Sequence, residues 1–416
     1  MLNTTTLSRY LSSGIAKFLF ANALYSLTTA IISFLSPSLL ENDVYVDFIY
    51  LFQMVLYLTG VFTVGLVPGL LRYYKLDNRK YEFYYYFTAS LILIFLLILG
   101  LIPGNFISVA LKIAPPSVHE SLMIYLSVIF SLLFIFNRGA QTAKCNYEAI
   151  LKDVVIIFIA RIMMLICVKI FDISNPYVIL SCFCVVPFIY ELWVFVSSMI
   201  KINISKLDAY WDFVCFILKI SITGIIFTST NRLFIISSKS YNSSLAAALS
   251  FAAGMTGIIT IFNTTFSSVF IGKLDHRNPE GVLHYIAKIK KYFIPFLFTT
   301  IILGICVFFV VTLIYPDNTV QAAIISAITV VHCALIAYVG LITLMTKTYN
   351  MLNIQILLNA SAFIIVFLFV RFCSVVINKY VTYIAINAIL LITEILLALI
   401  ILKRVKKNID IQLKQR

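Results

Sequence analysis

The chain has 416 residues, of which 62% are hydrophobic and only 12% are charged. Its mean hydropathy of +1.03 lies outside the range of soluble globular proteins and excludes a soluble enzyme or a soluble binding domain. The net charge of +14 does not indicate nucleic-acid binding, because the basic residues are concentrated in short gaps between long apolar runs, as they are in membrane proteins.

Apolar windows predict twelve membrane-spanning helices. A helix needs about 20 apolar residues to cross roughly 30 Å of hydrocarbon. Helices are favoured over strands because the runs are too long and too uniformly apolar for a membrane β-barrel. The predicted fold class is therefore an all-α membrane protein. In chain order, the predicted spans cover residues 14–35, 44–70, 84–103, 121–137, 154–171, 177–199, 213–236, 244–271, 293–315, 321–345, 353–371 and 381–402.

The basic residues predict the orientation of these spans. With the amino terminus on the cytoplasmic side, 22 of the 31 Lys and Arg residues fall in cytoplasmic segments, six fall within spans, and Lys112, Lys239 and Lys379 fall on the opposite side. Cytoplasmic loops of membrane proteins retain positive charge. We therefore predict that both termini are cytoplasmic.

The sequence lacks several common catalytic and nucleotide-binding motifs. It has no P-loop, no His-Glu-x-x-His and no Gly-x-Ser-x-Gly pattern, and its eight cysteines form no Cys-x-x-Cys pair. We therefore expect no enzyme activity, no cofactor and no metal site, and an ATP-driven pump is disfavoured. The predicted external loops are short, which disfavours a membrane-embedded sugar polymerase or ligase.

Six spans in each half predict two six-helix lobes related by a parallel pseudo-repeat. The stretch KYEFYYYFTASLILIFLLILGLIP, which starts at Lys80, is similar to KYFIPFLFTTIILGICVFFVVTLIYP, which starts at Lys291. The shared composition of apolar helices is the alternative explanation. The predicted domains are an N-terminal lobe at 1–200, a cytoplasmic linker at 201–212, a C-terminal lobe at 213–402 and a basic cytoplasmic tail at 403–416.

Two stretches carry a resemblance to a known family. The segment YVDFIYLFQMVLYLTGVFTVGLVPGLLRYYK, from Tyr45 to Lys75, resembles the second helix of bacterial O-antigen and polysaccharide flippases of the Wzx type. The segment TSTNRLFIISSKSYNSSLAAALSFAAGM is similar to the passage between their seventh and eighth helices, except that Asn231 stands where an acidic residue usually precedes Arg232. These flippases belong to the multidrug, oligosaccharidyl-lipid and polysaccharide exporter superfamily.

The resemblance implies a transporter in the bacterial cytoplasmic (inner) membrane. Such a protein moves a polyprenyl-pyrophosphate-linked oligosaccharide, the O-antigen repeat unit, between leaflets by alternating access of two lobes. Its partners are the lipid-linked oligosaccharide, membrane lipids and other polysaccharide assembly proteins, and it acts as a monomer. The alternatives are a multidrug or cation exporter of the same fold and a membrane-embedded polysaccharide polymerase or ligase.

Ionisable residues inside the predicted spans are candidate functional residues, because placing a charge at the centre of a membrane helix costs about 2.5–3.5 kcal/mol. Basic residues outnumber acidic ones there, which suits a negatively charged substrate such as a lipid pyrophosphate. The basic candidates for substrate binding are Lys17, Arg161, Lys219 and Arg232, and the acidic candidates for ion coupling are Glu191 and Glu394.

Depth along the helices relates some of these residues. Arg161 and Glu191 lie at the same level of neighbouring spans, which predicts either a structural ion pair or a shared transport role. Lys219 and Glu394 also share a level. Lys17 and Arg232 have no obvious acidic counterpart in the sequence, so they are expected to contact an anion, and the alternative is that their side chains reach the membrane surface.

Polar side chains also recur on single helix faces. Thr256, Thr260 and Asn263 follow helical spacing on the predicted eighth span. Such a face is typical of a wet cavity that binds sugar hydroxyls, and equally of tight helix packing in lipid. Pro187 interrupts the predicted sixth span and is expected to bend it.

Overall fold

A computed structural model describes residues 14–63, 65–74, 77–102, 104, 117–202, 208–238, 252, 279–314, 319–343, 345, 351–373 and 379–414. The regular elements in these ranges are α-helices and one 3-10 helix, which confirms the all-α prediction for this part of the chain. The helices fall into two compact units, Met1–Ala247 and Ala248–Arg416.

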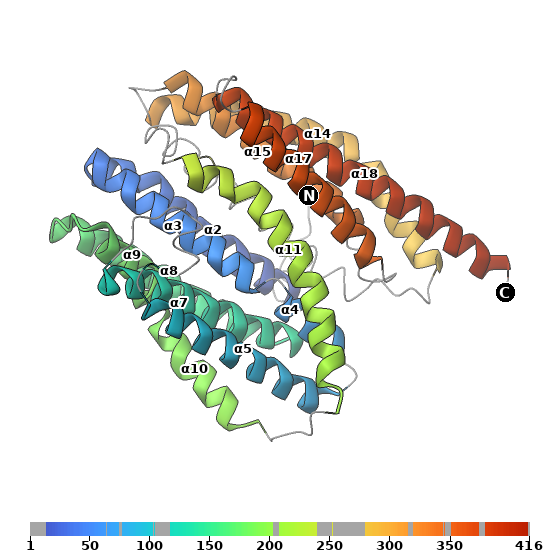
Figure 1. Cartoon of the computed structure of the whole chain (residues 1–416), viewed down its shortest axis with the longest axis horizontal. Helices are drawn as coiled ribbons and strands as arrows, with labels where there is room; N and C mark the ends of the chain where they lie inside the picture. Colours follow the sequence, from blue (N-terminus) through green and yellow to red (C-terminus); the bar gives the residue numbers. More distant parts are fainter. Residues whose placement is uncertain are drawn as a thin grey trace, which may run out of the picture. The chain divides into compact units, whose positions relative to one another are not determined.

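The described helices of the first unit are shown in blue to yellow-green in Figure 1. They are α2 (Gly14–Leu39), α3 (Asn42–Thr63), α4 (Leu66–Tyr73), α5 (Asn78–Gly100), α7 (Val118–Ala143), α8 (Tyr147–Ile170), α9 (Pro176–Cys184), the 3-10 helix η1 (Val186–Phe188), α10 (Ile189–Ile200) and α11 (Tyr210–Ser238). Those of the second unit are α14 (Pro279–Ile314), α15 (Thr319–Thr343), α17 (Leu352–Cys373) and α18 (Lys379–Lys414).

The helices match the predicted spans closely. Every predicted span except 244–271 overlaps a described helix, and that span lies outside the described residues apart from Ala252. By length and composition, eight of the described helical stretches can cross a membrane. Twelve spans and cytoplasmic termini remain predictions.

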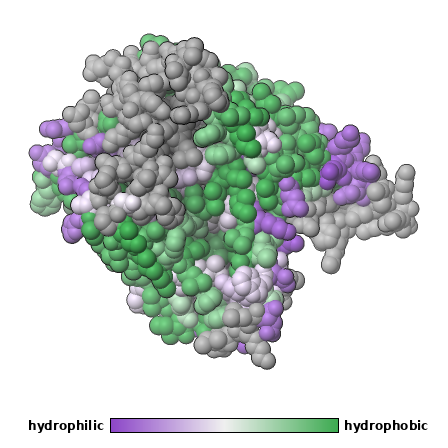
Figure 2. All heavy atoms as spheres, viewed as in Figure 1, coloured by the Kyte–Doolittle hydropathy of each residue, from purple (hydrophilic) through white to green (hydrophobic). Residues whose placement is uncertain are grey.

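Large apolar side chains are exposed along these helices, among them Phe20, Trp193, Ile294 and Phe309. Figure 2 shows hydrophobic residues covering large areas of the described surface in that view. Such a surface is stable in hydrocarbon and would associate or aggregate in water. The protein is a multi-pass membrane protein.

Polar caps fix where several helices begin. Ser117 and Glu120 form a capping box at the start of α7. The side chains of Asp77, Asn146 and Asn175 accept hydrogen bonds from backbone N–H groups in the first turns of α5, α8 and α9. These caps satisfy backbone donors that have no partner inside their own helix.

Helix α7 is the centre of the first unit, because it packs against α3, α4, α5, α8, α9 and α10. Helix α2 packs along α8. A buried cluster joins these elements and consists of Phe18, Ala21, Phe134, Ile150, Val154, Ile157 and Phe188. The polar site described below lies beside this cluster.

Helix α11 packs against α3 and α4 and therefore groups with the first unit. The predicted boundary at residue 213 instead assigned this helix to the C-terminal lobe. The hydroxyls of Tyr57 on α3 and Ser229 on α11 form a buried hydrogen bond of 2.9 Å. Assignment of helices to two repeated lobes remains a prediction.

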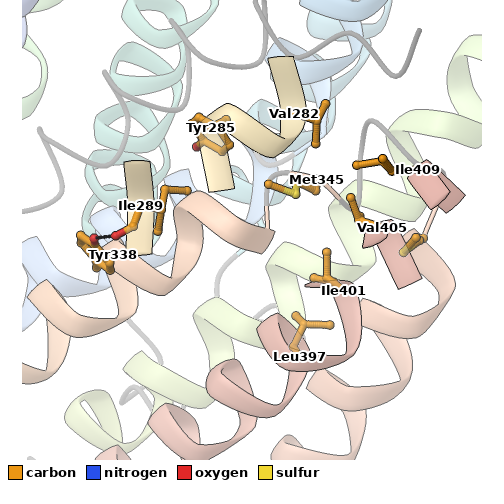
Figure 3. Packing of buried hydrophobic residues seen from close by; sticks show 10 residues of the cluster. Val282, Tyr285, Ile289, Tyr338, Met345, Leu397, Ile401, Val405 and Ile409 are labelled. Atoms are coloured by element: carbon orange, nitrogen blue, oxygen red, sulfur yellow. Dashed lines mark hydrogen bonds between the residues drawn. The ribbon is translucent and has the colours of Figure 1, made fainter. Parts of the chain in front are cut away.

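In the second unit, α15 packs against both α14 and α18, and α17 packs against α18. Their apolar core contains Val282, Tyr285, Ile289, Tyr338, Met345, Met351, Leu397, Ile401, Val405 and Ile409. Figure 3 shows the Tyr338 hydroxyl donating a hydrogen bond to the Ile289 carbonyl. The Tyr285 hydroxyl likewise donates to the Leu341 carbonyl at 3.1 Å.

Two glycines allow α11 to approach α4 closely. A Cβ atom added at Gly65 would overlap the backbone carbonyl oxygen of Ile217, and one added at Gly69 would lie 2.8 Å from the Ile217 side chain. Small residues four positions apart permit this kind of contact between membrane helices. Gly65 is therefore a packing residue.

We predict that Gly65→Ala destabilises the protein by about 1–3 kcal/mol, because a backbone atom cannot move aside as a flexible side chain can. The measurement is the thermal unfolding midpoint of the purified protein in detergent. Gly60→Ala, in the interior of α3, controls for helix propensity, which by itself favours alanine. A Gly65→Ala protein that unfolds at the wild-type temperature would contradict the assignment.

Candidate functional site

The predicted sixth span is broken in its middle. Helix α9 ends at Cys184, η1 contains Pro187, and α10 begins at Ile189. Figure 1 shows α9 and α10 as two separate helical segments. Proline has no backbone N–H, so the carbonyl four residues earlier, that of Phe183, loses its usual helical donor. In a membrane helix this carbonyl must find another partner.

Arg161 provides that partner. Its Nε donates to the Phe183 carbonyl at 3.3 Å. Its Nη1 donates to the hydroxyls of Thr28 and Thr29 on α2, at 3.4 and 3.3 Å. Arg161 is on α8 and is only 3% exposed, so a single buried side chain connects α2, α8 and the broken helix.

Aromatic rings complete the surroundings of Arg161. The guanidinium carbon lies 5.1 Å from the ring centroid of Tyr25 and 5.0 Å from that of Phe188. Both distances are within the range of cation–π attraction, which strengthens when the cation is removed from water. The rings therefore supply part of the electrostatic stabilisation that water gives an exposed arginine.

The predicted ion pair between Arg161 and Glu191 is absent. Within the described residues, ion pairs form between Lys17 and Glu148 and between Lys144 and Glu82, and no carboxylate pairs with Arg161. The turn at η1 separates the carbonyl bound by Arg161 from Glu191, whose carboxylate instead meets α7.

Glu191 is held by Asn137. The Nδ2 of Asn137 donates to Glu191 Oε2 at 2.7 Å and to the Glu191 backbone carbonyl at 2.8 Å. Glu191 is 1% exposed and lies in the first turn of α10, where the helix dipole stabilises negative charge. The carboxylate is thus stabilised by a neutral donor and a helix end.

Two side-chain amide oxygens on α7 are buried and have no hydrogen-bond partner among the described residues. They are Asn137 Oδ1 and Gln141 Oε1, which lie one turn apart on α7. An unsatisfied buried acceptor costs about 1–3 kcal/mol. Neither Asn137 nor Gln141 was predicted as a site residue from the sequence, although polar residues four positions apart lie on one face of a helix.

Lys17 does have an acidic counterpart, contrary to the sequence analysis. Its Nζ lies 3.5 Å from Glu148 Oε2, and both side chains are accessible. Exposed pairs of this kind contribute little stability. The pairing was missed because α2 and α8 are far apart in sequence but adjacent in the fold.

The remaining candidates are not brought together in the described residues. Lys219 is exposed on α11. Arg232 lies in α11, and its side chain lies outside the described part. Thr256, Thr260 and Asn263 also lie outside the described residues. Their proposed contacts with substrate remain predictions.

Glu394 belongs to the second unit. It is 6% exposed on α18 and has no ion-pair partner among the described residues. Tyr383 and Asn387 lie on the same helix and are also buried. The Tyr383 hydroxyl is 3.0 Å from that of Thr329 on α15. Among its described residues, each unit therefore holds one buried carboxylate that has no basic partner.

Comparison with known proteins gives the fold. No protein-family model matches the sequence, and no curated protein matches it. Among solved structures, a multidrug resistance MATE family transporter of the MOP superfamily, in an inward-facing conformation, is 12% identical, with a TM-score of 0.64 over 93% of this chain and 95% of that one.

Two other solved structures have similar TM-scores to this chain. The lipid II flippase MurJ, in an inward closed conformation, is 14% identical, with a TM-score of 0.63 over 95% of this chain and 88% of that one. A MOP superfamily transporter from Pyrococcus furiosus Vc1 is 13% identical, with a TM-score of 0.63 over 95% and 96%. Its description states that reverse polarity of the binding pocket suggests a different function.

We predict that Arg161→Met destabilises the protein by about 1–3 kcal/mol, because the Phe183 carbonyl is left without a donor. Pro187→Ala restores an N–H that can reach this carbonyl in a continuous helix. The double variant is therefore expected to recover part of the loss, measured by thermal unfolding in detergent. Strictly additive losses would show that Arg161 does not act through this carbonyl.

The first unit thus contains a buried arginine and a buried glutamate, each bonded to neutral groups among the described residues, and the second unit contains a buried carboxylate. Across its described residues, the structure has no cluster of three or more His, Cys, Asp or Glu that could hold a metal ion. At these identities, the comparisons establish that the chain has the fold of MOP superfamily transporters.

Proposed function

We propose that this chain is a flippase that moves a polyprenyl-pyrophosphate-linked oligosaccharide, of the O-antigen repeat-unit type, across the bacterial inner membrane. Transport proceeds by alternating access and includes no covalent chemistry. The cavity shelters the sugar and the pyrophosphate while the polyprenyl chain stays in the bilayer. The lipid II flippase with the same fold supports a lipid-linked substrate.

The observation that carries this proposal is the unpaired charge of Arg161. Its guanidinium is buried, and its bonding partners within the described residues are neutral oxygens at 3.3–3.4 Å. No hydrogen bond joins its Nη2 to any described residue. A guanidinium with donors to spare and no carboxylate suits a phosphate oxygen, which accepts charge-assisted bonds.

The other sequence candidates take complementary roles in this proposal. Lys17, Lys219 and Arg232 add positive charge for the pyrophosphate, and Lys17 exchanges Glu148 for the substrate. Thr256, Thr260 and Asn263 contact sugar hydroxyls. Glu191 and Glu394 couple an ion gradient to the transport cycle, since a buried carboxylate without a basic partner can exchange a proton or cation.

A multidrug or cation exporter is the second candidate function. The specific observation in its favour is that Glu191 and Glu394 are both buried and lack basic partners within the described residues. Buried acids of this kind suit a cationic substrate. The MATE transporters with this fold support the same alternative.

The test is deletion of the gene, followed by measurement of surface glycan and of the membrane side on which lipid-linked oligosaccharide accumulates. A flippase predicts loss of displayed glycan and complete repeat units facing the cytoplasm. Normal display with new drug sensitivity would instead identify an exporter. Displayed glycans of altered length would identify a polymerase or ligase.

We predict that the Arg161→Met/Pro187→Ala protein, expressed in the deletion strain, accumulates in the membrane but restores less than about a tenth of glycan display, the effect of losing a charged hydrogen bond of about 1.5–3 kcal/mol. Pro187→Ala alone is the matched control and is expected to restore display. If the double variant restores display fully, Arg161 has only a structural role, and the deletion result stands independently.

A further inference from the structure

Helices α14 and α18 of the second unit are longer than a membrane is thick. Each has 36 residues. A helix rises 1.5 Å per residue, so each is about 54 Å long, whereas the hydrocarbon core of a bilayer is about 30 Å thick. The uncharged part of α14 begins at Tyr292, and the apolar part of α18 ends at Leu402. Residues 279–291 and 403–414 therefore continue these helices beyond the apolar layer.

The two helical extensions pack together. Val282, Tyr285 and Ile289 of α14 belong to the same buried cluster as Val405 and Ile409 of α18, and Figure 3 shows these side chains. They recur at steps of three or four residues, so each extension buries one face and leaves the opposite face accessible. The extensions therefore lie on the same side of the membrane and present one joint surface.

The accessible faces of the extensions are strongly basic. The basic side chains that are exposed there, which we call the basic surface, are Lys288, Lys290, Lys291, Lys403, Arg404, Lys406 and Lys407. None of them forms an ion pair with a described residue, because the ion pairs in the described part of the chain join other residues. Their positive charge is thus available to an external anion.

The depth of these residues indicates what that anion is. All of them lie within five residues of Tyr292 or Leu402, which is about 8 Å along a helix axis. The headgroup layer on each side of the hydrocarbon is about 5–8 Å thick. Tyr292 is 56% exposed, as aromatic residues at a membrane interface commonly are. The basic surface therefore lies at the level of the lipid headgroups.

The distal parts of the extensions are not basic. Residues 279–287 and 408–413 contain no lysine or arginine. An acidic soluble protein that docked on the extensions would meet their distal parts first, so positive charge would be expected there. A lipid headgroup can reach only the part next to the membrane, which is where the charge is concentrated.

We propose that the basic surface binds the phosphate-bearing headgroups of anionic lipids. Lysine and arginine donate charge-assisted hydrogen bonds to phosphate oxygens. Clusters of four to eight basic residues next to a membrane helix are typical of anionic-lipid binding. The shared apolar cluster holds both helices together, so charges from both act on the same patch of headgroups. The proposal does not depend on which substrate is transported.

The first test measures lysine reactivity of the full-length protein in nanodiscs, which leave both membrane faces accessible. One sample contains dioleoyl phosphatidylcholine alone, and the other contains an equal mixture with dioleoyl phosphatidylglycerol. Lysines are acetylated with an amine-reactive ester and quantified by mass spectrometry. We expect the lysines of the basic surface to react at least about threefold more slowly with phosphatidylglycerol present, because phosphate oxygens occupy their ammonium groups.

Lys152 and Lys201 are the internal controls. Both are exposed and predicted to lie on the same side of the membrane, and neither has another basic residue within four positions. Their reactivity is expected to change much less. Equal slowing of the controls would reveal only the general potential of an anionic membrane and would overturn a specific site. Unchanged reactivity of the basic surface would overturn lipid binding and favour an acidic protein partner.

Inorganic phosphate distinguishes a lipid from a free anion. Added to the phosphatidylcholine nanodiscs at the concentration of the lipid phosphate, it is expected to leave the reactivity of the basic surface unchanged, because it is not concentrated at the membrane. Protection by inorganic phosphate equal to that by phosphatidylglycerol would overturn the assignment to a lipid.

Variants test the residues themselves. Native mass spectrometry of the detergent-purified protein measures how much phosphatidylglycerol it retains during a titration. Lys288→Gln/Lys290→Gln/Lys291→Gln is expected to weaken this retention at least about tenfold. The matched control, Arg79→Gln/Lys152→Gln/Lys201→Gln, removes the same charge from exposed positions of the first unit and should retain the lipid as the wild type does. Equal retention by both variants would overturn the proposal.

Thermal unfolding in detergent without phosphatidylglycerol separates binding from folding. Since the substituted lysines are exposed and outside the buried cluster, both variants are expected to unfold at the wild-type temperature. Added phosphatidylglycerol should then raise the unfolding temperature of the wild type and of the control more than that of the α14 variant. An equal rise in all three proteins would contradict binding at the basic surface.

Discussion

The hydrocarbon interior of a membrane supplies no hydrogen-bond partners, so every backbone N–H and carbonyl there must find one within the protein. The packing of the first unit follows from this constraint. Pro187 leaves the Phe183 carbonyl without a helical donor, and the Nε of Arg161 occupies that position at 3.3 Å. The same guanidinium reaches Thr28 and Thr29 on α2. One buried arginine thus compensates for the broken helix and connects three elements of the unit.

The buried glutamate of the first unit, like its buried arginine, is bonded to neutral groups. The carboxylate of Glu191 accepts a hydrogen bond from the Asn137 amide and lies at the start of α10, and no basic residue among those described pairs with it. Arg161 and Glu191 do not form an ion pair with each other. Each can therefore still bind an ion or substrate of opposite charge. The packing of the first unit is therefore compatible with transport, by the proposed flippase and by an exporter alike.

The fold by itself does not distinguish a lipid-linked oligosaccharide from a drug or other cation as the substrate. A MATE transporter and a lipid II flippase align with this chain over most of its length at 12% and 14% identity. Backbone packing of this kind depends on apolar helix faces and small residues such as Gly65 and Gly69. Substrate choice depends on a few polar side chains that a shared fold leaves free to differ.

The sequence alone determined the membrane environment, the helical class and the approximate place of each described helix, because the length of an apolar run and its flanking charges are local properties. It also located Arg161, Glu191 and Glu394 as charges inside spans. Only the tertiary structure decided their partners. Depth along a helix can be counted from sequence. The direction of the chain after the break at Pro187 and the choice of neighbouring helix are set by packing between distant segments. For that reason Arg161 meets a carbonyl instead of Glu191, and Lys17 meets Glu148.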